Sequence, residues 1–383
     1  MSAAKTYDVA VIGAGVFGAW TAWHLTHRGQ RVLLLDAYGP AHTRASSGGE
    51  SRIIRMGYGA DELYTRWSQR SLVQWKELFA ATQQPLFHET GVLWLAGKGE
   101  REKQTLETLQ RCGVSHRVVQ QAELAQRYPQ INCEGVEFAI FEPGSGVLMA
   151  RRAVAAVVAD AVGRGAEYRL AQVAAPGESG HPREIRTSAN EIISAEKFVF
   201  ACGAWLGKLF PQILGARIFP TRQEVFFFAT PPGDSRFAPP ALPTWLFQDD
   251  QVYGMPDLES RGLKIAFDRH GEGVDPDTQS RLATPQAAEQ ARRYVAHRFP
   301  ALREAAITES RVCQYENTSS GDFLVDRHPT LENVWFVGGG SGHGFKHGPA
   351  MGEYVAGQVL GNGDAEPRFS LASKETVQRR AVY

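Results

Sequence analysis

A glycine-rich turn lies near the N-terminus and is followed, one apolar segment later, by an acidic residue; the four positions are Gly13, Gly15, Gly18 and Asp36. The turn follows the apolar run 8–12, and a helical pattern continues from it to about His27. In such a unit the first glycine makes the tight turn, the second admits a phosphate, and the third lets helix and strand pack closely. The acid, which closes the apolar run 31–35, can accept hydrogen bonds from a ribose. The unit predicts a dinucleotide site; the alternative is a structural turn in a parallel sheet.

A second glycine-rich loop, FVGGGSGHGFK, lies near the C-terminus and leads into a helical pattern that begins near Pro349. A helix N-terminus and a run of backbone amides stabilise negative charge, and a reduced flavin carries such charge. The loop therefore favours FAD over NAD; the alternative is a tight turn without a ligand. We expect the cofactor to contact residues of this loop and of the polar segment SSGGES: Gly339, Gly342, Gly344 and Ser46.

Four cations lie in segments that a fold could bring together: Arg52, Arg55, Lys264 and Lys346. Arg52 and Arg55 are three residues apart and would share a face on a helical turn. If all four converge on the flavin, they create a site for an anionic substrate and for charge on the flavin. The alternative for each cation alone is an exposed position on the surface.

These residues need a scaffold, and hydrophobic periodicity predicts its elements. We expect a strand at 92–97, a second buried strand that meets a glycine turn within 197–205, an antiparallel sheet within 216–270, and a loop at 174–190. Helices are expected at four further segments: 60–82, 99–112, 151–165 and 284–299.

The order of these elements predicts an α/β fold, α+β overall, in which a discontinuous Rossmann-like domain binds FAD and a mixed or antiparallel sheet contributes the substrate domain. At about 100–200 residues per domain, the 383 residues suggest two domains. We place the FAD-binding domain at residues 1–82, 150–215 and 310–383, and the substrate domain at 83–149 and 216–309.

Composition excludes several classes of protein. The formal net charge is zero, so nothing indicates binding to nucleic acid or to an anionic membrane. We find no apolar segment of the ~18–20 residues that a membrane span needs, and no room for a signal peptide before the first strand. The four cysteines are widely separated, so neither a disulfide framework nor a metal site is expected. We predict a cytoplasmic protein, either a monomer or a small homo-oligomer.

Across nearly its whole length the sequence resembles monomeric sarcosine oxidase, N-methyltryptophan oxidase and the fructosyl-amino-acid oxidases. The resemblance is strongest in two segments, CQYENTSSGDFLVDRHP (313–329) and GSGHGFKHGPAMGE (340–353). Five shorter segments extend it: VIGAGVFG, SRIIRMGYG, FEPGSGVL, ACGAW and GLKI.

For the cofactor and O₂, the resemblance implies three roles. Cys313 matches the cysteine that bonds the flavin 8α-methyl group through sulfur, although a lone cysteine is more often a small buried hydrophobe. Arg52 matches a cation near the flavin ring. Lys264 matches the lysine that activates O₂, where a fixed cation stabilises superoxide as it forms.

For the substrate, Arg55 and Lys346 match the pair that holds a carboxylate, and a guanidinium fork fits a planar carboxylate. Tyr253 and Tyr315 match aromatic residues of the substrate cavity; the alternative for Tyr253 is ordinary core.

The sequence departs from the family at two positions. Asp268 stands where sarcosine oxidases carry a histidine that lines the substrate pocket, and Gly48 stands where the basic loop usually carries a histidine. An aspartate can pair with a cationic amine or accept hydrogen bonds from a polyol; the alternative is a surface ion pair with Arg269. Sarcosine itself is therefore doubtful as the substrate.

These observations predict an FAD-dependent oxidase that converts a secondary or N-substituted amino acid and O₂ to an imine and H₂O₂. Fructosyl-amino-acid and cyclic imino-acid oxidation are alternatives within the family. A third alternative is an amine dehydrogenase of the same fold that uses another electron acceptor, and a fourth is a flavin- or NAD-binding protein without catalysis. The coexistence of the four cations and Cys313 argues against the last, since a mere binder needs none of them.

Overall fold

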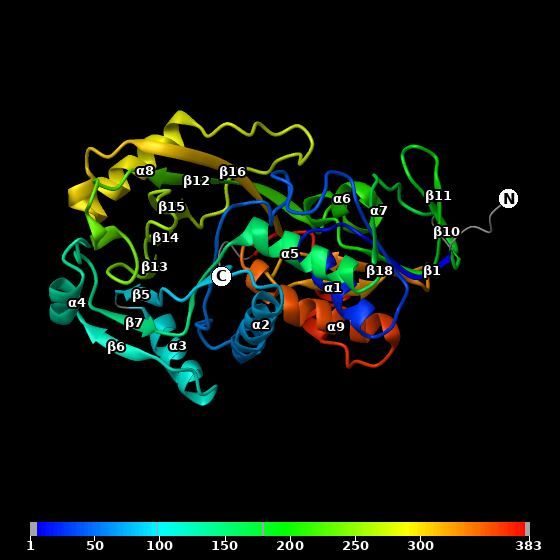
Figure 1. Cartoon of the computed structure of the whole chain (residues 1–383), viewed down its shortest axis with the longest axis horizontal. Coiled ribbons are helices and arrows are strands. Elements are labelled where there is room, and N and C mark those ends of the chain that lie inside the picture. The colour runs from blue at the N-terminus through cyan, green and yellow to red at the C-terminus, as the bar shows by residue number, and fades with distance from the viewer. Residues whose placement is uncertain (1–5, 98, 178–179, 380–383) are drawn as a thin grey trace.

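A computed structural model describes residues 6–97, 99–177 and 180–379 of the chain. Two large sheets dominate it and lie at opposite ends of the molecule (Figure 1). A small three-stranded sheet completes the set, in the order β3 (Arg52–Ile54), β8 (Gly146–Leu148) and β4 (Phe87–His88).

The seven-stranded sheet contains the N-terminal strand at its centre. Its order is β17 (Leu324–Arg327), β18 (Val334–Gly338), β11 (Ile192–Phe200), β1 (Thr6–Ile12), β2 (Val32–Asp36) and β9 (Glu167–Leu170), with β10 (Glu184–Arg186) paired to β11. The pairings of β1, β2, β9, β11 and β18 are parallel, whereas β10 and β17 pair antiparallel to their neighbours.

Both faces of this sheet are buried, which explains the continuous apolar run in β1. Val9 and Val11 belong to one hydrophobic core, and Ala10 and Ile12 belong to another. Successive side chains of a strand point to opposite faces, so the two cores lie on the two sides of the sheet.

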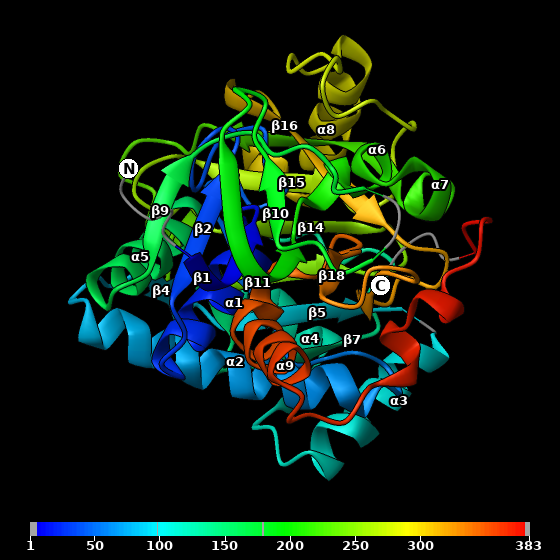
Figure 2. The same ribbon diagram turned by 90° about the vertical axis from the view of Figure 1, so that its right-hand side faces the viewer.

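Helices cover this sheet. On one side α1 (Val16–His27) packs against α5 (Ala150–Gly163) and α9 (Gly348–Leu360), and α2 (Glu62–Ala81) packs against α9. The short helices α6 (Leu206–Leu209) and α7 (Pro211–Leu214) lie on the other side of the sheet from α1 and α9 (Figure 2). The layers therefore form the doubly wound arrangement expected of a dinucleotide-binding fold.

The eight-stranded sheet is mostly antiparallel. Its order is β16 (Ile307–Asn317), β12 (Phe219–Phe228), β15 (Leu263–Phe267), β14 (Val252–Met255), β13 (Thr244–Phe247), β5 (Val92–Ala96), β7 (Phe138–Glu142) and β6 (Arg117–Gln120). The pairing of β13 with β5 is parallel. Near this sheet lie α3 (Glu100–Arg111), α4 (Gln121–Arg127) and α8 (Pro285–Arg298) (Figure 1).

Most of the predicted elements are confirmed, including the four helices, Pro349 in the first turn of α9, and the antiparallel sheet within 216–270. One expectation is wrong in part: residues 174–190 contain the short strand β10, whose three residues all pair with β11. Residues 178–179 lie outside the described part of the chain.

The division into two domains stays a prediction; the boundary proposed at 309/310 falls inside β16, which pairs along its length with β12.

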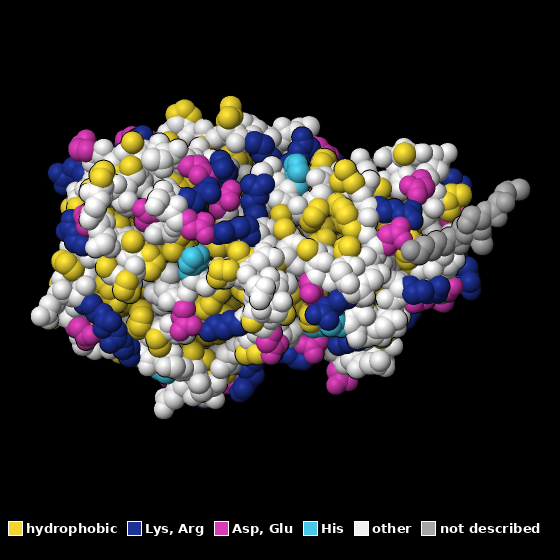
Figure 3. All heavy atoms as spheres, viewed as in Figure 1, with side chains coloured by type: hydrophobic (Ala, Val, Ile, Leu, Met, Phe, Trp, Pro, Cys, Tyr) yellow, Lys and Arg dark blue, Asp and Glu magenta, His cyan; other side chains and the backbone are white. Residues whose placement is uncertain are grey.

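The surface carries both signs of charge. Acidic and basic side chains are interspersed over the face shown in Figure 3, in keeping with the zero net charge. Among the described residues, no helix combines the length and the hydrophobicity that crossing a bilayer requires.

Candidate active site

One face of the eight-stranded sheet carries most of the candidate catalytic residues. Residues directly opposed on paired strands lie on the same face, and so do residues two apart on one strand. Lys264 is opposed to Phe227, and the register continues through β12 to β16. The residues on this face, reached from β14, β15 and β16, are Tyr253, Lys264, Asp268, Cys313 and Tyr315.

The opposite face of the same strands is apolar. Ile265 and Phe226 belong to a core that also contains Ala291 and Val295 of α8. Burial of this face fixes the register, because a slip of one residue would turn Lys264 into the core and Ile265 into the site.

A large cavity lies between the glycine turn, the end of β2 and the C-terminal glycine loop. Its empty space, mouth included, is about 1280 Å³. Eight predicted site residues line it: Gly13, Gly15, Asp36, Ser46, Arg52, Tyr315, Gly342 and Gly344. Gly339 lies between two lining residues, and Gly18 packs on Gly13 instead of lining the cavity.

The glycine turn has the geometry of a phosphate site. Gly13 has φ +107°, and a Cβ there would lie 2.3 Å from the Ala201 carbonyl oxygen. A Cβ at Gly18 would lie 1.8 Å from the Gly13 carbonyl oxygen. Helix α1 begins at Val16 with no side-chain cap and no acidic residue in its first turn. Its first amide groups are therefore available to an anion in the cavity, and the residues present fit the pyrophosphate of a dinucleotide.

Asp36 ends β2 at the wall of the cavity. One carboxylate oxygen accepts a hydrogen bond from the Ala14 amide at 2.7 Å, and the other accepts from the amides of Tyr38 and Gly39 at 2.8 and 2.9 Å. Asp36 thus joins the glycine turn to the loop after β2. Contact with a ribose stays a prediction.

Arg52 and Cys313 lie together at the junction of the cavity and the sheet face. The Arg52 guanidinium donates to the Ser46 carbonyl oxygen at 2.8 Å and to Cys313 Sγ at 3.4 Å. Gly49 leaves room for this guanidinium, since a Cβ there would lie 2.4 Å from it. Because Ser46 and Arg52 line the cavity, the Cys313 thiol lies beside the cofactor site.

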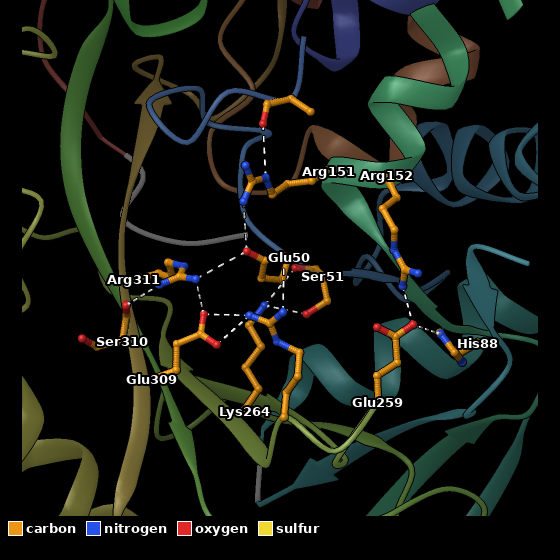
Figure 4. Close-up of polar contacts among 12 residues, drawn as sticks. Glu50, Ser51, His88, Arg151, Arg152, Glu259, Lys264, Glu309, Ser310 and Arg311 are labelled. Carbon is orange, nitrogen blue, oxygen red and sulfur yellow. Dashed lines mark hydrogen bonds and ion pairs between the residues drawn. The ribbon is translucent and has the colours of Figure 1, made fainter. Parts of the chain in front are cut away.

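Lys264 points from β15 toward Ser51, as Figure 4 shows. Its Nζ donates to the Ser51 carbonyl oxygen at 2.8 Å and is 3.0 Å from Ser51 Oγ. The side chain is 2% exposed. Burial, and next the positive charge of Arg52, hold the pKa of Lys264 well below the ordinary lysine value.

A network of ion pairs lies near Lys264 (Figure 4). Glu50 contacts Arg151 of α5 at 3.3 Å and Arg311 of β16 at 3.7 Å, and Glu309 pairs with Arg261 and Arg311 at 2.6 Å. Exposed pairs of this kind contribute about 0–1 kcal/mol each. We therefore assign the network a geometric role: it fastens the loop of Ser51 to both α5 and β16.

Arg55 is 5% exposed and held between two aromatic rings. Its guanidinium carbon lies 4.4 Å from the Tyr58 ring centroid and 4.7 Å from that of Trp94, and the guanidinium donates to the Gly57 carbonyl oxygen. These contacts leave the planar fork rigid, which suits recognition of a carboxylate.

Glu142 holds the segment after Arg55 in place. It is fully buried, and its carboxylate accepts hydrogen bonds from the amides of Met56 and Gly57 at 2.7 and 3.0 Å. It also accepts from Trp94 Nε1 at 2.7 Å and from Ser145 Oγ at 2.6 Å. Four donors satisfy the buried charge, so Glu142 fixes both Arg55 and the ring that stacks on it.

Lys346 extends from the C-terminal glycine loop and is 4% exposed. Its Nζ donates to Tyr58 Oη at 2.7 Å and to the His343 carbonyl oxygen at 3.0 Å. Burial lowers the pKa of Lys346 well below its ordinary value, and Arg55 adds to the shift, whereas the carboxylates of Asp268 and Glu142 oppose it. Arg55, Lys346 and Asp268 therefore lie close enough to influence one another.

Asp268 follows β15 on the face of Lys264, and Tyr315 Oη donates to its carboxylate at 3.1 Å. Burial raises the pKa of Asp268, although Arg55, the Tyr315 hydrogen bond and Lys346 oppose the shift. Burial also raises the pKa of Tyr253 to about 12 and that of Tyr315 well above its ordinary value, so both phenols stay neutral donors. The side chain of Asp268 thus points to the site. The alternative of a surface ion pair with Arg269 is wrong, because Arg269 donates to Gln251 instead.

Sequence reasoning missed several residues of this site. Two of them hold the proposed carboxylate-binding cations: Tyr58 contacts both Arg55 and Lys346, and Glu142 binds the backbone that follows Arg55. Glu316 lines the cofactor cavity, accepts from Ser46 Oγ at 3.0 Å, and has a pKa raised by burial. Glycines at 203 and 340 make room for this carboxyl group, since a Cβ would lie 2.7 and 3.0 Å from its oxygens. An acid inside the CQYEN motif was the one available signal.

Comparison with known proteins gives matches over nearly the whole chain. A family model described as FAD dependent oxidoreductase matches residues 8–358. The chain is 31% identical to monomeric sarcosine oxidase of Bacillus sp. (strain B-0618), over 98% of this chain and 99% of that protein. It is 28% identical to N-methyl-L-tryptophan oxidase of Salmonella heidelberg (strain SL476), over 95% of this chain and 97% of that protein. Amadoriase I from Aspergillus fumigatus, a fructosyl amine:oxygen oxidoreductase, has a similar fold, with a TM-score of 0.80 at 20% identity over 96% of this chain and 89% of that one.

Proposed function

The chain belongs to the DAO family of FAD-dependent oxidoreductases, and on that premise we propose that it oxidises a secondary or N-substituted amino acid. The substrate loses a hydride from the C–H next to nitrogen and a proton, and the resulting imine hydrolyses to an amine and a carbonyl compound. The two electrons and two protons reduce O₂ to H₂O₂. The observation that carries the proposal is the convergence of Arg55, Lys346 and Asp268 beside the cofactor cavity, with Lys264 on the same sheet face.

Arg55 and Lys346 are proposed to bind the substrate carboxylate. Both are buried cations, and each lowers the energy of a negative charge at Asp268. The same cations disfavour a protonated amine in the pocket. Because a neutral amine is the form that can release a hydride, the pair both orients the substrate and selects its reactive form.

FAD, when bound, accepts the hydride and transfers the electrons to O₂. The residues that we propose to hold it are the uncapped N-terminus of α1, Asp36, Ser46, Arg52 and the C-terminal glycine loop. Lys264 is proposed to stabilise the negative charge that develops on O₂, because a preorganised cation in a buried site does so without reorganisation.

We further propose that Cys313 bonds the cofactor covalently. Replacing Cys313 with serine is expected to release all flavin into the supernatant on acid precipitation, whereas the unmutated protein keeps its colour in the pellet, because serine is a much weaker nucleophile than a thiolate. Cys202→Ser is the matched control: Cys202 lines the same cavity, and burial raises the pKa of its thiol, so its loss should leave the bond intact. Free flavin from the unmutated protein would contradict covalent attachment.

A second candidate substrate, a fructosyl amino acid, is favoured by Asp268. Among the described residues, Tyr315 is the one hydrogen-bond donor to its carboxyl group, which leaves acceptor capacity for substrate hydroxyl groups. Since Arg55 and Lys346 disfavour a charged amine nearby, hydroxyl donors are a better fit for Asp268 than an ammonium group. A plain N-methyl group would not need this acid.

Asp268→Asn separates the two candidates. We expect kcat/KM for a fructosyl amino acid to fall about 10-fold or more, the value of a hydrogen bond to a charged group, with less than about 3-fold change for an N-methyl amino acid. Asp234→Asn, at an exposed pair with Arg236, is the control and should change neither. An equal loss for both substrates would place Asp268 at the amine, and no loss for either would remove it from the substrate site.

The reaction itself is tested by incubating the protein with N-methyl, cyclic and fructosyl amino acids and measuring peroxide. We expect peroxide with at least one member of the panel. Reduction of the flavin without peroxide would favour a dehydrogenase that uses another acceptor. The cytoplasmic location and the monomeric or small homo-oligomeric state remain predictions from the sequence.

A further inference from the structure

A cluster of buried rings lies next to Lys346. Its members come from the segment after β3, from α2, from the loop between β16 and β17, and from the C-terminal loop: Tyr58, Tyr64, Phe323, His343 and His347. Phe323 and His343 stack with centroids 4.8 Å apart, and Tyr64 lies edge-on to His343 at 4.9 Å. Most of these contacts are packing, but three of the residues form a chain of hydrogen bonds that ends on Lys346.

Tyr58 Oη is the centre of that chain. Lys346 Nζ donates to it at 2.7 Å, His347 Nε2 is 2.8 Å from it, and His343 Nδ1 is 3.3 Å from it. Tyr58 is 3% exposed and His347 is fully buried, so water does not compete freely for these contacts.

The partners of the two histidines determine where the protons lie. His343 Nε2 is 3.0 Å from the Gly321 carbonyl oxygen, which only accepts, so Nε2 carries the proton and Nδ1 is an acceptor in the neutral ring. His347 Nδ1 has no hydrogen-bond partner among the described residues. A buried N–H without an acceptor is costlier than a free lone pair, so the proton of His347 belongs on Nε2.

The direction of each hydrogen bond at Tyr58 follows. His347 Nε2–H donates to the Tyr58 oxygen, and the Tyr58 hydroxyl proton points to His343 Nδ1. The Tyr58 oxygen therefore presents a lone pair to Lys346 and cannot turn its proton toward it. A hydrogen-bond acceptor fixed in this way favours the ammonium form of lysine over the neutral amine.

We infer that Tyr58, oriented by His343 and His347, is a positioning residue that holds the Lys346 ammonium group in place for the substrate carboxylate. The inference rests on the proposed role of Lys346 in carboxylate binding. Tyr58 contributes twice, since its ring also stacks on the Arg55 guanidinium at 4.4 Å. One side chain thus couples both cations of the proposed site.

Acetate binding to the oxidised holoenzyme tests the inference without turnover. We expect Tyr58→Phe, which keeps the ring over Arg55, to raise the acetate Kd about 10-fold, as measured by the change in flavin absorbance. Tyr64→Phe is the matched control: it removes a buried hydroxyl of the same cluster that donates to Asp322 at 2.9 Å, and it should leave the acetate Kd unchanged.

A double-mutant cycle shows whether Tyr58 acts through Lys346. In a Lys346→Met background, Tyr58→Phe should change the acetate Kd by less than about 2-fold, because the ammonium group that it holds is gone. An undiminished 10-fold effect in that background would overturn the inference and assign Tyr58 a general structural role. If Lys346→Met alone leaves the acetate Kd unchanged, the carboxylate site itself is wrong, and the inference falls with it.

The pH dependence gives an independent readout. The charged and titratable groups that face Lys346 are Arg55, Asp268, Glu142, His343 and His347, together with Tyr58. Loss of the Tyr58 acceptor should lower the pKa of Lys346 further, so acetate binding should weaken at lower pH in Tyr58→Phe than in the unmutated protein. An unchanged midpoint contradicts the inference.

If Tyr58→Phe does not fold or does not bind flavin, His347→Phe replaces it, since an aromatic ring is kept and the donor to Tyr58 is lost. We expect about a 3-fold rise in the acetate Kd, again absent in the Lys346→Met background. A rise that persists in that background would overturn the inference as well.

Discussion

Replacement of Lys264 with methionine is expected to slow reoxidation of the reduced flavin by O₂ about 10²- to 10³-fold, which is what the loss of one preorganised charge stabiliser typically costs. Methionine keeps the length and apolar packing of the side chain but removes the ammonium group that Ser51 holds at 2.8 Å. Reduction by substrate should change far less, because in the described part of the chain no contact joins Lys264 to Arg55 or Lys346. The two half-reactions, followed separately by rapid mixing, check the prediction.

The chain offers a matched control for Lys264. Lys374 is 1% exposed, and burial lowers its pKa to about 8, yet its ammonium group donates to the Arg368 carbonyl oxygen and to Ser373 Oγ and not to Ser51. Lys374→Met should leave the reoxidation rate constant of intact holoenzyme unchanged. Equal slowing in both variants would mean that general destabilisation, and not the charge at Lys264, explains the effect.

Arg55→Ala has the second largest expected effect. KM for a carboxylate substrate should rise 10-fold or more, since a hydrogen bond to a charged group contributes about 1.5–3 kcal/mol. If the guanidinium also orients the reacting C–H, kcat falls as well, because binding energy that positions the substrate is realised in the transition state. Steady-state kinetics with a substrate and with the amine that lacks its carboxylate measure both effects. For the amine, Arg55→Ala should change KM and kcat little.

Arg55→Lys distinguishes charge from shape. It keeps a cation but loses the planar fork that lies between Tyr58 and Trp94. We therefore expect its KM to lie between that of the unmutated protein and that of Arg55→Ala. Arg293→Ala, at a position with 79% side-chain exposure, should leave KM unchanged. An unchanged KM in Arg55→Ala would mean that the carboxylate binds elsewhere.

Local patterns were enough to predict the nucleotide-binding half of the fold. The strand, glycine turn and helix at residues 8–27 are close in sequence. Close backbone contacts require the glycines there, so the sequence motif alone identifies the turn. Helices α2 and α8 were likewise visible from periodicity. Strand β10 was missed because it is three residues long and lies in a polar segment, so only its pairing with β11 defines it.

The candidate site was harder to predict, because its parts meet through strand register. Lys264 and Cys313 are on strands separated by β12, and their spacing in the sequence does not predict that both side chains point to the same face. The resemblance supplied these residues, whereas the residues that hold them were missed. Glu142 accepts from the Met56 amide 86 positions away, and Tyr58 accepts from Lys346 across 288 positions. Such contacts depend on the complete tertiary structure.

The central claim is that one site combines a flavin, a carboxylate-bound amine substrate and an O₂-activating lysine. Mixing the holoenzyme anaerobically with N-methyl, cyclic and fructosyl amino acids, and then admitting air, tests it most directly. We expect at least one of these compounds to bleach the flavin, and air to restore the colour with one H₂O₂ formed per flavin. A flavin that dithionite reduces but that no member of the panel bleaches would contradict this claim.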